Sequence, residues 1–141
     1  MRGDRPVVAS WIVPAVWKIF QRRILHVEST RAKLGRMRQI GVDLRNKAQF
    51  GFEHHEDIQP WMDAVAQWNS DIIGAIRNVS DADAEWFAIA DIVEHPRIPM
   101  QTTEPNVSDD RSFFLYNLHD FRLLKLEELI SGTKGNLLLR M

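Results

Sequence analysis

A regular spacing of three and four residues runs from Val13 to Ala48. Such a spacing places side chains on one face of an α-helix, and its persistence over many turns is typical of a helix packed along a bundle. The stripe consists of Val13, Val16, Phe20, Arg23, Val27, Thr30, Leu34, Met37, Gly41, Leu44 and Ala48. The sequence therefore predicts one long helix near residues 12–49, with Pro14 in its first turn.

Two glycines fall in the second half of this predicted helix. Gly35 and Gly41 would each cost about 1 kcal/mol relative to alanine in a helix interior. A bend or break between residues 35 and 41 is therefore the alternative to a continuous helix. Gly51 supplies the stop, because glycine readily adopts the left-handed conformation that often follows a helix end.

A second helix is predicted over residues 60–79, because large apolar residues recur there every three or four positions. They are Trp61, Val65, Trp68, Ile72, Ile76 and Val79. Pro60 suits the first turn, because the backbone N–H groups there have no acceptor within the helix and proline lacks this group. Trp68 lies midway along the apolar face, so we expect it in the core.

A third helix is predicted over residues 81–93. Ser80 followed by Asp83 resembles a capping box with aspartate in place of glutamate. Pro96 follows the predicted end, and residues 94–107 hold three prolines without a sustained period. We therefore expect that segment to be a loop.

The last helix is predicted over residues 109–131, with Asp109 or the serine before it as the N-cap and Gly132 beyond its end. Leu118 lies midway along its apolar face, so we expect it in the core as well. Together these elements predict an all-α fold: an antiparallel bundle of about four helices with one long N-terminal helix and no sheet.

Composition is consistent with one folded domain, since 45% of the 141 residues are hydrophobic and five are tryptophan. The chain has no cysteine, which excludes disulfides and thiolate metal sites and fits a reducing compartment. Residues 1–50 hold eleven bases and three acids, whereas residues 51–141 hold seven bases and sixteen acids. These opposite charges indicate either self-complementary packing or a basic arm that seeks an anionic partner.

We divide the chain into an N-terminal segment (1–20), a helical domain (21–131) and a C-terminal tail (132–141). The apolar run over residues 7–20 would be about 21 Å long as a helix, too short for a hydrocarbon core of roughly 30 Å. Its rings and the bases that follow resemble an interfacial anchor. The residues expected to contact a membrane or a partner are Trp11, Trp17, Phe20, Arg22 and Arg23. The alternative is that the segment forms the first part of a buried core helix.

A cluster of imidazole and carboxylate groups follows the first predicted helix: Glu53, His54, His55, Glu56 and Asp57. These groups suit zinc or iron chemically, but metal ligands on a helix need a shared face, and adjacent side chains in a loop tend to diverge. We therefore interpret the cluster as a solvated polar turn, with no metal and no cofactor expected.

Catalytic motifs with a phosphate loop, a dinucleotide loop or a nucleophile elbow do not occur in the sequence. His119 and Asp120 are neighbours in the last predicted helix, where a histidine is more often a hydrogen-bonded boundary residue than a catalyst. The basic residues between Arg31 and Lys47 have no aromatic neighbour for base stacking, so nucleic-acid binding is disfavoured.

We therefore expect a non-enzymatic helical association module, cytoplasmic and peripheral to the cytoplasmic face of a membrane. Its expected partner is an anionic membrane surface or a partner helix, with a second copy of the chain as a further candidate. The alternative is an enzyme whose site is unmarked in the sequence, with a metal at residues 53–57. The third hypothesis is nucleic-acid binding through the basic N-terminal helix.

The interpretation of residues 53–57 as a polar turn predicts no specific zinc site. Calorimetric titration with zinc should show no stoichiometric, sub-micromolar binding. Tight binding that is abolished by His54→Ala or His55→Ala would instead establish a metal centre and favour the enzyme hypothesis.

Overall fold

A computed structural model describes residues 4–89 and 107–132, with side chains described from residue 14 onward. Its helices are α1 (Asp4–Ala48), α2 (Ile58–Arg77), α3 (Asp81–Ala88) and α4 (Asp110–Ser131), with a short 3-10 turn at His55–Asp57. In these two described ranges the only β-type pairing consists of two isolated bridges, and there is no strand. The predicted all-α bundle with a long first helix is confirmed.

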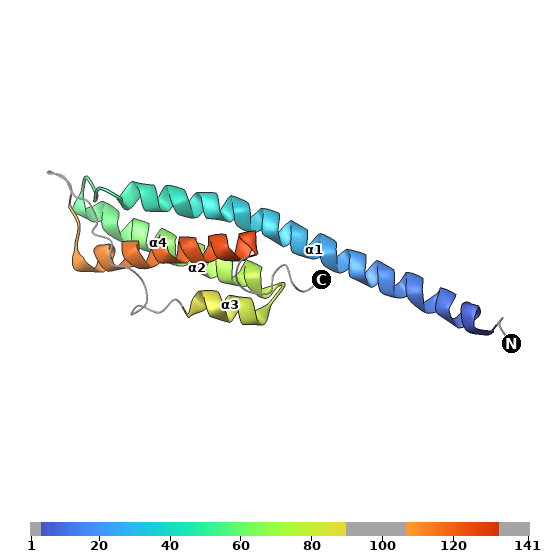
Figure 1. Ribbon diagram of the computed structural model, residues 1–141. Coiled ribbons are helices and arrows are strands. Elements are labelled where there is room, and N and C mark those ends of the chain that lie inside the picture. Colours follow the sequence, from blue (N-terminus) through green and yellow to red (C-terminus); the bar gives the residue numbers. More distant parts are fainter. Residues whose placement is uncertain (1–3, 90–106, 133–141) are drawn as a thin grey trace.

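Helix α1 extends far beyond the rest of the molecule. Figure 1 shows α2 and α4 lying beneath one half of α1, with α3 below them, while the other half of α1 continues past their ends to the N-terminus. At 1.5 Å per residue, the 45 residues of α1 span about 68 Å, against about 30 Å for the 20 residues of α2. The two shorter helices can therefore cover only part of α1.

Helix α1 begins earlier than predicted and has no break at its glycines. It starts at Asp4, so Pro14 lies inside the helix and not in its first turn. Pro6 falls in the first turn, where proline is tolerated, and Asp4 at the start complements the helix dipole. The helix is continuous through Gly35 and Gly41, so the predicted alternative of a break there is wrong.

Several predicted caps form, but α3 is shorter than predicted. The Ser80 hydroxyl accepts a hydrogen bond from the backbone of Asp83, Asp109 forms a capping box, and Gly51 and Gly132 both have positive φ. Helix α3 ends at Ala88, not near residue 93, because the next backbone leaves the helical conformation. The predicted remainder of this helix, and the predicted loop up to residue 106, lie outside the described residues.

The buried faces of α1 and α2 are the predicted ones, whereas α4 exposes Phe114 and Leu124 of its apolar residues and buries Leu123 and His119 instead. All six apolar residues of the α2 stripe are buried, and the α1 stripe is buried or half-buried from Arg23 to Ala48. Trp68 and Leu118 are both buried, as predicted. The α1 stripe therefore does belong to a bundle seam, but only over the half of α1 that α2 and α4 cover.

Three helices meet at Gly41. A Cβ atom at this position would lie 2.5 Å from the Trp68 ring of α2 and 2.8 Å from the Leu123 side chain of α4. The Gly41 carbonyl accepts a hydrogen bond from Nε2 of His119, at 2.7 Å. Glycine is therefore required at this point by close packing and not by backbone conformation.

Two indole groups hold α2 in register with α1. The Nε1 atoms of Trp61 and Trp68 donate to the backbone carbonyls of Leu44 and Met37, each at 2.7 Å. The two tryptophans are seven residues apart, and so are the two acceptors. The later tryptophan pairs with the earlier acceptor. This pairing fixes α1 and α2 as antiparallel neighbours and gives both buried indoles a partner.

Ion pairs repeat the same spacing on the α4 side. Arg45 lies 3.0 Å from Asp120, and Arg38 lies 3.4 Å from Glu127. Both pairs join a basic residue of α1 to an acidic residue of α4, again seven residues apart on each helix and in reverse order. Part of the opposite charge of the two halves of the chain is therefore satisfied within the molecule.

The two glycines of α1 predict opposite effects of the same substitution. Gly41→Ala should destabilise the protein by about 1–3 kcal/mol, because the added methyl group overlaps Trp68 and Leu123. Gly35→Ala should stabilise it by about 0.5–1 kcal/mol, because no atom lies within 4 Å of the added group and alanine favours the helix. Urea unfolding of both variants tests this, and equal effects would contradict the packing at Gly41.

Candidate functional site

The part of α1 that passes beyond the bundle is the first candidate site. Every residue from 14 to 20 is exposed, and the first side chain that reaches the bundle is that of Arg23, whose guanidinium donates to the Val79 carbonyl at 3.3 Å. The described part of the apolar run therefore lies outside the core. We call residues 4–22 the projecting segment.

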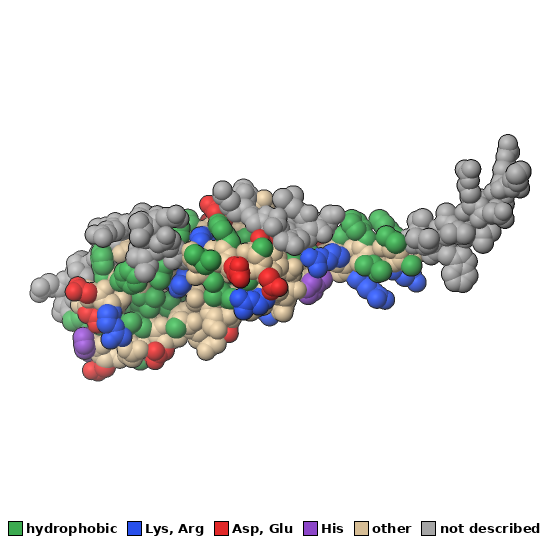
Figure 2. All heavy atoms as spheres, turned by 90° about the horizontal axis from the view of Figure 1, so that it is seen from below, with side chains coloured by type: hydrophobic (Ala, Val, Ile, Leu, Met, Phe, Trp, Pro, Cys, Tyr) green, Lys and Arg blue, Asp and Glu red, His purple; other side chains and the backbone are tan. Residues whose placement is uncertain are grey.

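Large apolar side chains are exposed on the projecting segment. Trp17 is 55% exposed, Ile19 67% and Phe20 37%. The Trp17 and Phe20 rings stack on each other, with centroids 5.8 Å apart, so each covers part of its neighbour without being buried. Figure 2 shows hydrophobic side chains beside basic ones on the part of the helix that leaves the bundle. Exposed apolar surface of this kind makes the segment a candidate interaction site.

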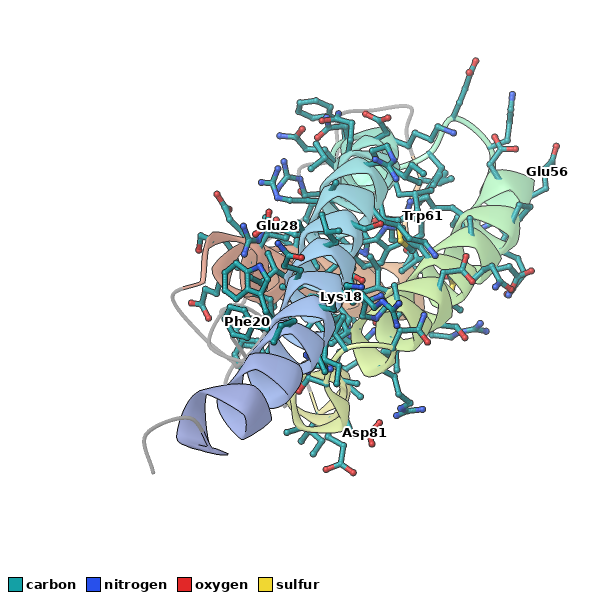
Figure 3. All side chains as sticks on the ribbon, turned by 90° about the vertical axis from the view of Figure 1, so that its right-hand side faces the viewer. Lys18, Phe20, Glu28, Glu56, Trp61 and Asp81 are labelled. Atoms are coloured by element: carbon teal, nitrogen blue, oxygen red, sulfur yellow. The ribbon has the colours of Figure 1, made fainter. Side chains whose placement is uncertain are left out.

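The basic residues near this segment differ in their surroundings. Lys18 and Arg22 are exposed and have no ion-pair partner among the residues that the structure describes, whereas Arg23 is half-buried and bonded to the bundle. Figure 3, viewed along α1 from its N-terminal end, shows Phe20 and Lys18 on different sides of the helix. Of the predicted contact residues, Trp17 and Phe20 stack on each other, whereas Arg22 is one helical turn from Lys18 and lies on the side of Lys18. Arg23 fixes the helix to the bundle, and the side chain of Trp11 lies outside the described set.

The histidine and carboxylate cluster forms an exposed turn between α1 and α2. Residues 53–57 are all exposed, and the shortest ion pair among them joins Nε2 of His54 to Glu53 at 4.0 Å. Glu56 extends away from the bundle in Figure 3. Within the two described ranges, no group of three or more histidine, aspartate or glutamate side chains is placed to hold a metal ion. His55 and Asp57 belong to the 3-10 turn that leads into α2.

His119 is a core residue and not the boundary residue expected from the sequence. It is fully buried, its ring packs edge-on against Trp68 with centroids 4.8 Å apart, and its Nε2–H donates a hydrogen bond to the Gly41 carbonyl. Burial lowers the pKa of His119 to about 4, and Nδ1 has no hydrogen-bond partner within the described chain. The neighbouring Asp120 pairs with Arg45, so the two residues do not form an acid-base pair.

An apolar pocket lies where α1, the exposed turn and α2 meet. It has a volume of about 270 Å³ and is lined by Leu44, Lys47, Phe52, Asp57, Pro60, Trp61 and Ala64. Among these described lining residues there is one lysine and one aspartate, without a histidine or a hydroxyl nucleophile. The pocket therefore adds no catalytic pair to the candidates.

The basic residues of α1 between positions 31 and 47 do not form one group, which the sequence alone did not reveal. Arg31 pairs with Glu28, and Arg38 and Arg45 pair with α4. Lys33, Arg36 and Lys47 are exposed and lack such partners in the described structure. The two sets of bases lie on different sides of α1. Which bases find a partner can be seen only in the folded structure, where α2 and α4 pack against the helix.

Comparison with known protein families, curated proteins and solved structures finds no match to this chain. None of the described helices is both long enough and apolar enough to cross a membrane.

The buried neutral His119 predicts loss of stability in acid. Its pKa is about 4 in the folded protein and 6.5 in the unfolded chain, so the unfolded state binds more protons between these values. The stabilisation is complete above about pH 6.5 and is lost as the pH falls towards 4, by roughly 3 kcal/mol. Urea midpoints at about pH 7 and pH 4.5 measure the loss.

Two substitutions separate His119 from the other acid-sensitive groups. His119→Gln can still donate to the Gly41 carbonyl but cannot titrate, so its stability should fall less between the two pH values. His26→Gln removes an exposed histidine and should leave the slope of the original protein unchanged. Equal slopes in all three proteins would show that His119 does not set the acid sensitivity.

Proposed function

We propose that this protein is a non-enzymatic helical association module that docks peripherally on an anionic membrane, at its cytoplasmic face, through the projecting segment of α1. The observation that carries the proposal is the exposure of Val16, Trp17, Ile19 and Phe20 beyond the end of the bundle. A folded protein gains nothing from exposing these side chains to water, whereas an interfacial helix buries them at the level of the lipid headgroups.

Apolar burial supplies the part of the affinity that salt does not screen. Full burial of one large apolar side chain contributes about 1.5–3 kcal/mol, and Trp17, Ile19 and Phe20 would each contribute less because their atoms already contact α1 in part. Lys18 and Arg22 add attraction to anionic headgroups, about fivefold in affinity for each base close to the surface. The combination favours reversible, moderate binding.

A bilayer explains the segment better than a partner helix does. The sequence from Val7 to Trp17 is apolar on all sides of the helix except at Ser10, whereas a helix partner requires only one apolar stripe. The bases that follow the run outnumber those before it, and this asymmetry favours the cytoplasmic side for the bundle. A second copy of the chain or a different helical protein is the competing occupant.

Vesicle binding tests the proposal. The full-length protein should co-sediment with vesicles that contain phosphatidylserine, less with neutral phosphatidylcholine vesicles, and less but still measurably at high salt. Trp17→Gln combined with Ile19→Gln should weaken binding by at least about tenfold at unchanged net charge, because the apolar contribution is removed.

Leu124→Gln is the matched control, since Leu124 is a half-exposed apolar residue of α4, away from the projecting segment. This variant should bind vesicles like the original protein. Absence of binding to anionic vesicles at low salt would refute the membrane proposal. If that absence came with concentration-dependent self-association lost in the Trp17/Ile19 variant, the segment would be a helix-pairing surface.

A further inference from the structure

The side of α1 that faces α4 is marked by residues seven positions apart. Arg38 and Arg45 on this side pair with acidic residues of α4. Seven residues make almost two helical turns, so Arg31 and Ile24, which continue the same series towards the N-terminus, face nearly the same way. We call the side of the helix that carries these four residues the α4 side of α1.

Helix α4 ends before this side of α1 does. Glu127 pairs with Arg38, and α1 and α4 are antiparallel, so Ser131 at the end of α4 lies about opposite residue 34. Helix α3 packs on α2 and α4 and does not reach α1. Figure 1 shows α1 continuing past the ends of the other helices. None of the described helices therefore covers the α4 side of α1 before residue 34.

Apolar side chains continue the seam of α1 beyond the end of α4. Val27 is fully buried, Ile24 is half-buried, and Phe20 and Trp17 are exposed, so the exposure increases away from the bundle. Trp17 lies seven residues before Ile24, and its ring stacks on that of Phe20. These spacings of three and four residues place the side chains on one face of the helix. We call Trp17, Phe20 and Ile24 the outer seam.

Arg31, on the same side, carries two buried nitrogen atoms without a hydrogen-bond partner among the described residues. These atoms are Nε and Nη2, whereas Nη1 lies 3.0 Å from the carboxylate of Glu28. Buried N–H groups of a guanidinium need acceptors, and backbone carbonyl groups are the most common ones. A stretch of chain lying against α1 just after the end of α4 would supply such carbonyl groups.

We infer that residues 133–141, which follow α4 and lie outside the described residues, cover the outer seam. Residues 137–139 are all leucine, and they would pack on Ile24 and Phe20 while the chain before them passes Arg31. The cover itself does not depend on membrane docking. Its consequence rests on the proposed function: the leucines and the lipid compete for the same side chains, so the cover weakens binding to the bilayer.

The chain after α4 is long enough to reach the outer seam. Gly132, with φ 81°, ends α4 about opposite residue 33, and the antiparallel direction of α4 carries the chain towards the N-terminal end of α1. From residue 33 to Ile24 and Phe20 the distance along α1 is about 14 and 20 Å. An extended chain spans about 3.3 Å per residue, so residues 137–139 can lie up to about 17–23 Å beyond Gly132.

A segment of the same chain fits the outer seam better than a second copy does. A short tether gives an effective concentration in the millimolar range, so a small apolar contact is enough to hold the segment in place. A stable interface between two proteins buries about 800 Å² on each partner, which exceeds the area that three partly exposed side chains provide.

Disulfide formation tests the cover, because the chain has no cysteine of its own. Ile24→Cys combined with Leu138→Cys should form a disulfide within one molecule under mild oxidation. Leu25→Cys combined with Leu138→Cys is the matched control, because Leu25 lies at the same height on α1 but about 100° around the helix and is 69% exposed. The first pair should cross-link at least about tenfold faster, since a disulfide requires Cα atoms within about 7 Å.

Vesicle binding tests the competition with lipid. Leu137→Gln combined with Leu138→Gln should raise the affinity of the full-length protein for phosphatidylserine vesicles by about threefold or more, because a surface that is open a third of the time binds with a third of its intrinsic affinity. Leu124→Gln makes the same change at an exposed leucine of α4 and should leave the affinity unchanged. Circular dichroism checks that each variant is folded.

The two experiments fail separately. Equal cross-linking rates of the two cysteine pairs would overturn the cover, and disulfides that form only between molecules would replace it by a contact with a second copy. Unchanged or weaker vesicle binding of the Leu137/Leu138 variant would overturn the competition with lipid. If neither this variant nor the original protein binds anionic vesicles at low salt, the proposed function fails, and the cross-linking rates still decide the cover.

Discussion

The close packing at Gly41 is the contact on which the rest of the bundle depends. Only a residue without a side chain lets Trp68 and Leu123 approach α1 at this point, and only this approach brings His119 within 2.7 Å of the Gly41 carbonyl. The tryptophan hydrogen bonds on one side and the ion pairs on the other then repeat at seven-residue intervals around it. One glycine thus sets the register of both long neighbours of α1.

Sequence periodicity predicted the helices well, because an apolar stripe follows directly from burial of one face. It could not distinguish Gly35 from Gly41, since both carry the same intrinsic helix penalty and differ only in what packs against them. Trp17, Phe20 and Arg22 were identifiable as a candidate surface, but whether they were exposed depended on how far α2 and α4 extend along α1. The sequence predicted a boundary position for His119, because its burial likewise depends on how the helices pack together.

The charge asymmetry of the chain has two parts with different physical roles. Arg38 and Arg45 face acids of α4, so their charge contributes to the bundle itself. Lys33, Arg36 and Lys47 are exposed, where a charge without a partner contributes little to folding and remains available to attract a molecule of opposite charge. A sum of charges over residues cannot separate these roles, because adjacent residues on a helix point in different directions.

Helix α1 connects the projecting segment to the bundle without a linker. Asp4 and Ala48 belong to one unbroken helix, so the two parts behave as a stiff lever and not as domains on a tether. Over a length of about 68 Å, a rotation of 10° at one end displaces the other by roughly 12 Å. Any contact that fixes the N-terminal end of α1 therefore also fixes the position and tilt of α3 relative to that contact. A flexible insertion in α1 would let the bundle move independently of the projecting segment.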